Sequence, residues 1–232
     1  MIRGVAAGPV TVDDFLTDSS VSIAGNAGTG STATDVTSTG GGAIGGERDS
    51  AIEILANGND SNTVDANASG GDYNAGIPSQ GSDALYRTTI QYDGTDNDAL
   101  TLSSGLGPVD LVDGTNDRFR FLITENDFAF DLDATVIDAD GTEGTATGFS
   151  TGGNIAAGDP AVGLDVPYSS FSNNPDFSQI AGLEFGLEGG SSADLSFDAV
   201  TATTTEVPVP GTFGLLGVGV IGLGAFLRRR QV

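Results

Sequence analysis

The sequence predicts an all-β protein, an antiparallel β-sandwich followed by one C-terminal hydrophobic helix. Short apolar stretches alternate with Gly, Ser, Thr, Asn and Asp along the chain, and 36 of the 232 residues are glycine. Before residue 207, no stretch keeps a helical period of apolar residues over three turns. Short alternating stretches between turn residues are typical of the strands of a sandwich or barrel.

Eight stretches fit the strand pattern. In chain order they are Pro9–Phe15, Ser20–Ala24, Arg48–Ala56, Ala84–Tyr92, Arg118–Thr124, Phe128–Ile137, Gly182–Leu187 and Asp194–Thr201. The segments Gly25–Gly46 and Gly58–Gly81 are rich in Gly, Thr and Asn, so we expect long surface loops there.

A first hairpin is expected over residues 118–133, with residues 124–127 as its turn. Its apolar side chains fall on one face: Phe119, Phe121, Ile123, Phe128, Phe130 and Leu132. Pairing Ile123 with Phe128 gives two ion pairs on the outer face, Arg118 with Asp133 and Arg120 with Asp131. Each pair is worth under about 1 kcal/mol, but together they specify the register. A clamp for a sugar or a carboxylate is the alternative interpretation of these four charges.

A second hairpin is expected over residues 183–199. Pairing Leu187 with Leu195 sets Phe185 opposite Phe197, with both rings inward. The same register gathers four carboxylates on the outer face: Glu184, Glu188, Asp194 and Asp198. Because like charges directly opposite each other destabilise a sheet, either salt screens this acidic cluster or a cation binds to it, and we favour screening. The order of the strands resembles that of the jelly-roll sandwiches found in carbohydrate-binding modules.

The charge of the chain limits its partners. All eight basic residues are arginines, and 32 acidic residues give a formal net charge of −24. Nucleic acid is excluded as a natural partner, since its phosphates would be repelled. A solvated acidic surface that keeps a secreted protein soluble in salt is favoured over cation binding, because Asp is spread along the whole chain.

The composition also limits the chemistry. The chain has no His, Cys or Lys. This excludes Ser-His-Asp and Cys-His nucleophilic sites, Schiff-base chemistry and the usual zinc sites. A carboxylate pair for glycoside hydrolysis is conceivable, but nothing singles out a pair, and Trp, the usual sugar-stacking residue, is absent. We therefore predict no enzymatic activity.

Asp93, Asp96 and Asp98 lie on a short turn after an expected strand. Their carboxylate oxygens suit Ca²⁺ rather than a transition metal. Clusters of Asp, Asn and Gly also occur in turns without a metal, and the spacing is not that of an EF-hand. No cofactor is required, and Ca²⁺ is the one candidate. A second candidate loop contains Asp138, Asp140 and Glu143.

The C-terminal segment has the pattern of a membrane span. Residues Phe213–Leu227 form an uncharged apolar run that is followed by Arg228, Arg229 and Arg230. A helix of this length spans roughly 22 Å, a little short of a comfortable transmembrane helix. The arginine cluster places the C-terminal end in the cytoplasm and the preceding domain across the membrane.

The order of proline motif, apolar span and arginine cluster resembles the PEP-CTERM sorting signal of Gram-negative bacteria that make extracellular polysaccharide. The motif region is Val207, Pro208, Val209, Pro210, Gly211 and Thr212. Val209 stands where that family usually has Glu. The resemblance implies that an exosortase, an integral-membrane enzyme similar to cysteine proteases, recognises the motif and removes the tail. The protein would then be held transiently at the inner membrane before reaching the cell surface or the medium.

A chain with this tail is expected to carry a secretion signal. Residues 1–7 lack an apolar core segment, but small residues precede Gly8 as at a signal cleavage site. We therefore expect residues 1–7 to be the remnant of a signal whose start lies upstream. The expected organisation is residues 1–7 as this remnant, 8–203 as an acidic sandwich, 204–212 as stem and sorting motif, 213–227 as transmembrane helix and 228–232 as basic end.

Three functions fit the sequence. The leading hypothesis is a non-enzymatic exported protein with a structural or binding role in the envelope or in an exopolysaccharide or biofilm matrix. The second is a carbohydrate-binding module, which would need an exposed stacking platform built from its tyrosines: Tyr73, Tyr86, Tyr92 and Tyr168. The third is a glycan-active enzyme, which would need a concave site with two carboxylates about 5–10 Å apart.

Overall fold

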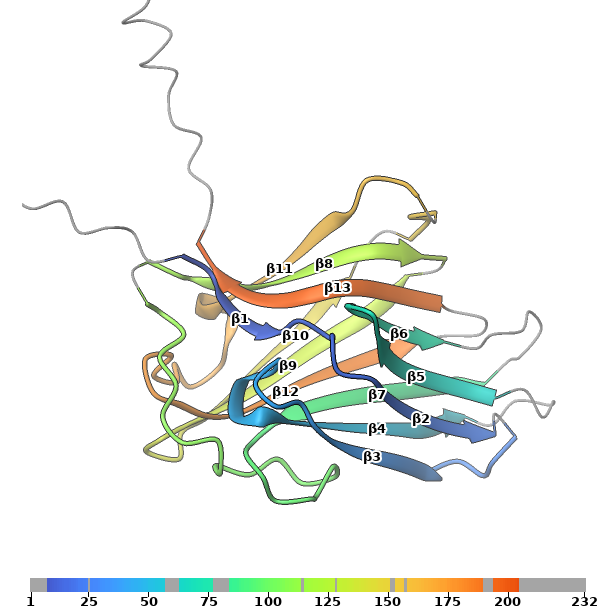
Figure 1. Cartoon of the computed structure of the whole chain (residues 1–232), viewed down its shortest axis with the longest axis horizontal. Helices are drawn as coiled ribbons and strands as arrows, with labels where there is room; N and C mark the ends of the chain where they lie inside the picture. The colour runs from blue at the N-terminus through green and yellow to red at the C-terminus, as the bar shows by residue number, and fades with distance from the viewer. Residues whose placement is uncertain are drawn as a thin grey trace, which may run out of the picture.

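The computed structural model describes residues 8–24, 26–56, 63–76, 84–113, 115–127, 129–150, 153–156, 158–189 and 194–204. Two antiparallel sheets pack face to face (Figure 1). The eight predicted strands are all present, with ends that differ by at most two residues from those expected. Within the described residues, no helix is long and apolar enough to cross a membrane. The expected helix 213–227, the basic end, the sorting motif and residues 1–7 lie outside the described part of the chain.

Sheet A has seven strands. Its order is β11 (Val162–Pro167), β8 (Arg118–Asn126), β13 (Asp194–Thr203), β6 (Asp72–Gly76), β5 (Thr63–Ser69) and β2 (Ser19–Ala24), and β1 (Val10–Asp13) also pairs with β13. Val10 lies opposite Ala202, whereas β6 pairs with the first half of β13. The described chain therefore begins and ends at the same end of the sandwich.

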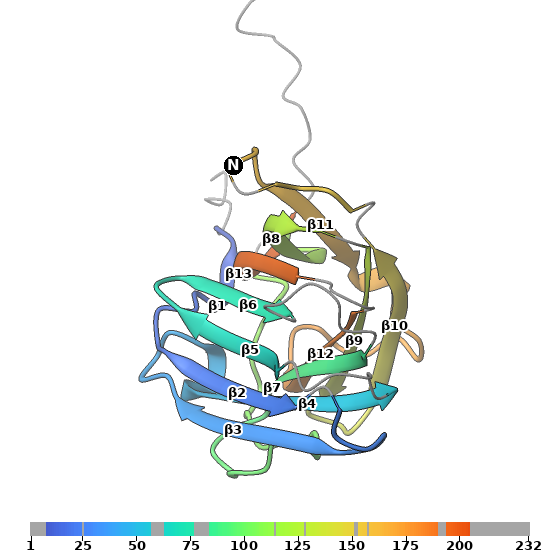
Figure 2. The same ribbon diagram turned by 90° about the vertical axis from the view of Figure 1, so that its right-hand side faces the viewer.

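Sheet B has six strands. Its order is β10 (Glu143–Ser150), β9 (Phe130–Asp138), β12 (Ile180–Gly189), β7 (Leu85–Tyr92), β4 (Glu47–Ala56) and β3 (Thr32–Ser38). Two short 3₁₀ turns, η1 (Ile44–Gly46) and η2 (Tyr168–Ser170), complete the described elements. The view along the strands shows the two layers edge-on, with β2 and β3 at one side and β11 and β10 at the other (Figure 2).

The two expected hairpins are wrong. β8 lies in sheet A and β9 in sheet B, so the link between them crosses from one layer to the other. β12 and β13 are likewise separated into sheets B and A. The apolar faces were nevertheless assigned correctly, because a strand buries the same alternate residues whether its neighbour in sequence pairs with it or packs across the core.

The predicted long loops contain strands. β3 lies within the segment expected to be the loop 25–46, and both β5 and β6 lie within 58–81. β10 and β11 were also missed. These strands are short or carry Ala, Thr, Asp and Gly in place of branched apolar residues. Their pairing depends on neighbours distant in sequence, which weak local patterns do not reveal.

Aromatic rings from both sheets form the centre of the core. The ring of Phe185 on β12 packs edge-on against Phe121 at 4.8 Å and Phe119 at 5.3 Å, both on β8. The ring of Phe121 also packs edge-on against Phe197, and Phe197 packs edge-on against Phe15. Edge-to-face packing of this kind adds about 0.5–1.5 kcal/mol per pair beyond the area that is buried.

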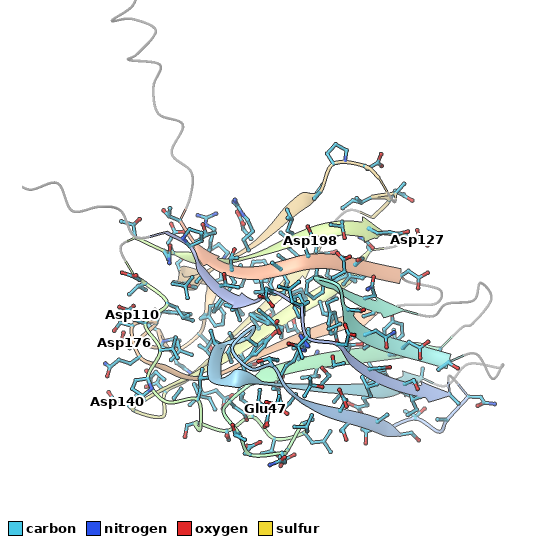
Figure 3. All side chains as sticks on the ribbon, viewed as in Figure 1. Glu47, Asp110, Asp127, Asp140, Asp176 and Asp198 are labelled. Carbon is cyan, nitrogen blue, oxygen red and sulfur yellow. The ribbon has the colours of Figure 1, made fainter. Side chains whose placement is uncertain are left out.

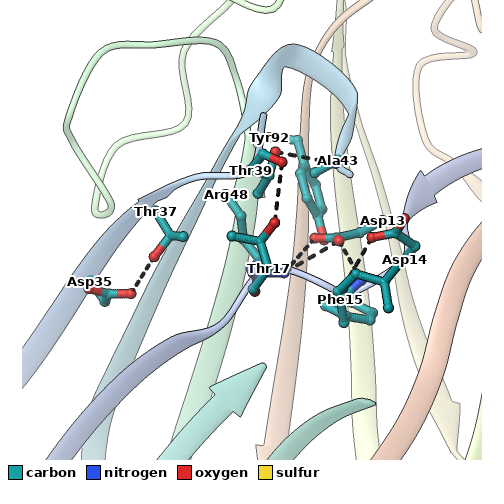
Figure 4. A network of polar contacts seen from close by, with 11 residues as sticks. Asp13, Asp14, Phe15, Thr17, Asp35, Thr37, Thr39, Ala43, Arg48 and Tyr92 are labelled. Atoms are coloured by element: carbon teal, nitrogen blue, oxygen red, sulfur yellow. Dashed lines mark hydrogen bonds and ion pairs between the residues drawn. The ribbon is translucent and has the colours of Figure 1, made fainter. Parts of the chain in front are cut away.

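A charged network lies inside the same core (Figure 4). Arg48 on β4 is 0% exposed, and its Nη1 donates to Asp13 Oδ2 at 3.1 Å. The hydroxyl of Tyr92 donates to the same oxygen at 2.9 Å, and Arg48 Nη2 donates to the carbonyl of Thr17 at 2.5 Å. The guanidinium also lies 5.2 Å from the ring of Phe15. This network joins β1 of sheet A to β4 and β7 of sheet B.

Candidate functional site

The four carboxylates of the expected acidic cluster do not come together. Glu184 lies on sheet B, where its Oε2 accepts from Gln91 Nε2 at 2.7 Å. Asp198 lies on sheet A beside Asp72. Glu184 and Glu188 of β12 belong to sheet B, whereas Asp194 and Asp198 of β13 belong to sheet A, where Figure 3 labels Asp198. Since the β12–β13 hairpin does not form, the like-charge contacts that it implied do not arise.

The expected ion pairs of Arg118 and Arg120 are also wrong. Both arginines bind Asp165 of β11, Arg118 Nη1 at 2.9 Å and Arg120 Nε at 2.7 Å. Asp133 instead binds Arg87 of β7 at 3.1 Å. Both arginines thus pair with β11, a strand that the sequence pattern did not predict. The two guanidinium groups hold the pKa of Asp165 below its usual value, and the hydrogen bond from Arg120 is the largest cause.

The second candidate loop is a turn that the Asp138 carboxylate holds by accepting backbone N–H groups. The carboxylate of Asp138 accepts N–H groups of Asp140 at 3.1 Å, Thr142 at 2.8 Å and Asp176 at 3.0 Å. These bonds lower the pKa of Asp138, with the one from Asp176 as the largest cause. The side chain therefore has a structural role in joining two loops at one end of the sandwich.

The structure changes the membership of the first calcium candidate. Asp96 lies with Glu47 and Asp49 of β4, and the ligand oxygens of these three residues lie within 4.8 Å of one another. Asp93 at the end of β7 adjoins Asp49. Asp98 is exposed and lies outside this group of three. We refer to Glu47, Asp49, Asp93 and Asp96 as the β4–β7 carboxylate group.

Glu47 and Asp49 were missed although a signal exists for them. They are the residues directly before and after Arg48. In a strand, successive side chains point to opposite faces, so Arg48 lies on one face and both acids lie on the other. Arg48 points into the core, so the acids lie on the outer face of sheet B. Their closeness to Asp96 depends on the β4–β7 pairing, which the sequence does not reveal.

A cleft of about 300 Å³ lies on the outer face of sheet A. Four polar residues in register cross the sheet there: Asn67 on β5, Asn74 on β6, Ser196 on β13 and Glu125 on β8. Asp65 and Asp194 complete the polar lining, and burial raises the pKa of Asp65. Such a row presents both donors and acceptors to a hydroxyl-rich ligand.

A smaller groove of about 190 Å³ lies on the outer face of sheet B. Arg87, Gln91 and Glu184 line its floor, and Leu100 of the loop after β7 lines its wall. Gly186 of β12 leaves the space in which the guanidinium of Arg87 lies, since a β-carbon there would overlap it. Arg87 is thereby held between Asp133 at 3.1 Å and Glu184 at 4.0 Å.

The four tyrosines form no stacking platform. Tyr73, Tyr86 and Tyr92 are buried in the core. Tyr168 is half-buried and stacks on Phe177, with ring centres 3.9 Å apart. No aromatic residue is among the described residues that line either cleft. The described surfaces can therefore offer hydrogen bonds to a ligand, but none of these four tyrosines presents a ring on which a sugar could stack.

Comparison with known proteins identifies the tail. The family model described as the PEP-CTERM protein-sorting motif matches residues 206–230. The match confirms the resemblance found in the proline motif, the apolar span and the arginine cluster. The chain thus carries a sorting motif that indicates an exported protein. No curated protein matches the chain.

Several solved structures are similar to the sandwich. A family 11 carbohydrate-binding module of a cellulosomal cellulase of Clostridium thermocellum is 13% identical, with 87% of this chain and 97% of that chain covered and a TM-score of 0.37. The family 11 module of the same organism in complex with a β-1,3-1,4-mixed-linked tetrasaccharide is 14% identical, with coverage of 86% and 98% and a TM-score of 0.36. The CBM22-1–GH10 modules of its xylanase 10B, complexed with xylohexaose, are 9% identical, with coverage of 85% and 29% and a TM-score of 0.34.

Proposed function

We propose that the protein is an exported, non-enzymatic component of a Gram-negative cell envelope or exopolysaccharide matrix, with a structural or binding role. The observation that carries this proposal is the sorting motif at residues 206–230. In this proposal an exosortase-type membrane enzyme removes the tail, and the inner membrane holds the protein until that step.

The sandwich suits delivery by such a tail. β13 ends at Thr203, three residues before the matched motif begins at Glu206. β1 and the end of β13 lie side by side, so the rest of the domain extends away from the attachment point (Figure 1). The charge of −24 favours a well-hydrated surface in a salt-rich medium, where mobile ions screen the mutual repulsion of the carboxylates.

The chemical inventory supports a role without catalysis. The chain has no His, Cys or Lys, so the thiol and amine nucleophiles and the imidazole general base are lacking. Three of its carboxylates are occupied by structural contacts. Asp165 binds two arginines, Asp13 binds Arg48, and Asp138 binds three backbone N–H groups.

A polysaccharide is the second proposed partner, at the cleft on sheet A. The cross-strand row of Asn67, Asn74, Ser196 and Glu125 favours this function, because amides, a hydroxyl and a carboxylate can bond sugar hydroxyls in two directions. A neutral polymer is favoured over an acidic one, since the protein is itself strongly negative.

Mass spectrometry of the native protein recovered from culture tests the main proposal. A C-terminus near Pro210 in the surface or secreted fraction is expected, with the arginine cluster absent. An intact Val232 in a protein that stays in the inner membrane would contradict processing. Recovery from the cytoplasm would contradict export altogether.

Affinity electrophoresis through gels that contain neutral soluble polysaccharides tests the second function. Retardation of the wild-type protein and its loss in Asn74→Ala are expected, because Asn74 is exposed in the cleft and its truncation leaves the core intact. Thr147→Ala, at an exposed position on β10 of the other sheet, is the matched control and should migrate as the wild type does. Equal migration of all three proteins in every gel would exclude glycan binding at this cleft.

A further inference from the structure

We propose that the β4–β7 carboxylate group binds one Ca²⁺ ion, with Glu47, Asp49 and Asp96 as ligands and Asp93 beside them. The three ligand oxygens lie within 4.8 Å of one another. Oxygens on opposite sides of one Ca²⁺ are separated by roughly 4.6–5.2 Å, twice the usual bond length. A single ion therefore fits among them without moving the strands.

Unpartnered buried oxygens point to a missing ligand at this position. Asp49 is 1% exposed, and within the described residues neither of its carboxylate oxygens accepts a hydrogen bond from an N–H or hydroxyl donor; its close neighbour is the carboxylate of Asp93. Asp93 is 0% exposed, and its Oδ1 also lacks a partner, while its Oδ2 accepts from Ser103 N at 2.6 Å. Buried carboxylates are ordinarily hydrogen-bonded, ion-paired or bound to a metal, because an isolated buried charge is very costly.

Among the described residues, the remaining neighbours supply no counter-charge. Arg48 is adjacent in sequence, but it faces the core and binds Asp13. Gln91 lies opposite Asp49 in the β4–β7 register, and its Oε1 is a further buried oxygen without a partner. The group thus holds several oxygens and no described cation.

The chemistry of the donors selects the ion. All the candidate ligands are oxygens, with no imidazole or thiolate, which suits Ca²⁺ and Mg²⁺ rather than zinc or copper. Ca²⁺ accepts six to eight oxygens and tolerates irregular geometry, whereas Mg²⁺ needs a near-ideal octahedron and keeps several waters. Several crowded carboxylates therefore favour Ca²⁺.

The ion would fix the loop after β7 to sheet B. Glu47 Oε1 already accepts the N–H groups of Asp96 at 3.2 Å and Asn97 at 3.3 Å, so the start of the loop folds over β4. At its far end, Leu106 N donates to Ala181 O of β12 at 3.0 Å. Leu100, between these anchors, forms a wall of the groove on sheet B. Ca²⁺ binding would strengthen the contact between Glu47 and the start of the loop, and it would thereby stabilise the wall formed by Leu100.

Calorimetry on the purified full-length chain tests the proposal. The protein is first treated with chelator, and the thermal midpoint is then measured with Ca²⁺ or Mg²⁺ in 0.5 M NaCl, which screens diffuse attraction to the acidic surface. A Ca²⁺ concentration one hundred times the Kd should raise the midpoint by roughly 5–10 °C. Isothermal titration should give one site per chain.

Asn substitutions identify the ligands. In Asp49→Asn the Ca²⁺-induced shift should vanish and the affinity should fall at least about tenfold, because charge count sets the affinity of such sites. The metal-free midpoint should not fall, since the substitution removes a repulsive charge. Asp96→Asn should also lose the shift. Asp98→Asn is the matched control, because Asp98 is an exposed acid of the same loop, and it should respond as the wild type does.

Three outcomes would overturn the site. They are a wild-type protein without a Ca²⁺-induced shift, an equal shift with Mg²⁺, and an undiminished Ca²⁺ response in both Asp49→Asn and Asp96→Asn. None of these outcomes bears on export or on the cleft of sheet A, because the site depends on neither.

Discussion

Replacing Asp13 by Asn removes one charge from the core and leaves its shape almost unchanged. The Oδ1 of Asp13 accepts the N–H of Phe15 at 2.8 Å, and an Asn carbonyl can retain this turn. Arg48 loses its counter-ion and keeps two neutral acceptors, the Asn carbonyl at the Oδ1 position and the carbonyl of Thr17. Both members of the pair are at most 1% exposed, so water does not reach the guanidinium that remains.

The expected cost follows from this burial. Removing one partner of a buried pair costs about 3–5 kcal/mol, because the other charge stays buried and uncompensated. For a domain of this size, that corresponds to a fall in the thermal midpoint of roughly 6–20 °C. Asp165→Asn is the comparison, since it removes a carboxylate from a partly exposed pair. It should cost under about 2 kcal/mol, as surface ion pairs do.

Urea unfolding followed by far-UV circular dichroism measures both free energies. The double variant Asp13→Leu with Arg48→Met removes the pair as a unit and should be more stable than Asp13→Asn, because apolar replacements of buried pairs are often neutral or better. A deficit relative to the wild type should remain, since the Tyr92 hydroxyl and the Phe15 N–H both lose their acceptor on Asp13. An Asp13→Asn protein no less stable than Asp165→Asn would refute the reasoning. It would mean that Arg48 gains solvent by local rearrangement.

Three further results are expected. Asp138→Asn should make the free energy of unfolding depend less on pH between about pH 2 and 5. The pKa of Asp138 is lowered in the folded state, so its contribution to stability is full above its ordinary pKa near 4 and is lost as the pH falls. Urea midpoints measured against pH test this. Gly182→Ala should lower the free energy of unfolding by about 1–3 kcal/mol, because the new β-carbon would overlap the carbonyl oxygen of Ser103 and force the backbone to move. Gly186→Ala should cost less than about 1 kcal/mol, since the overlapping atoms belong to the flexible end of Arg87, and equal costs for the two glycine variants would contradict this distinction.

Alternation along the strands was enough to predict which side chains are buried. Phe119, Phe121, Phe185 and Phe197 were expected to face inward, and all four are buried. The pairing inferred from the same pattern was wrong, because Phe185 lies across the core from Phe121 in the other sheet. Both arrangements bury the same faces, so periodicity alone cannot separate them.

The candidate sites show the same limit. Asp93, Asp96 and Asp98 were grouped because they are close in sequence. The described structure retains Asp96, with Asp93 beside Asp49, and it replaces Asp98 by acids from β4. The row across sheet A was not foreseen, because Asn67 and Asn74 lie in a segment expected to be a loop.

The sequence by itself determined the sorting motif, the all-β class, the buried faces and the narrow range of available chemistry. Each of these depends on composition or on residues within a few positions of one another. Only the tertiary structure decided which strands share a sheet, which acid each arginine binds, and which carboxylates meet at the end of β4. Those outcomes depend on pairing between strands that are distant along the chain, and a strand's own sequence specifies its buried face far more strongly than its neighbour.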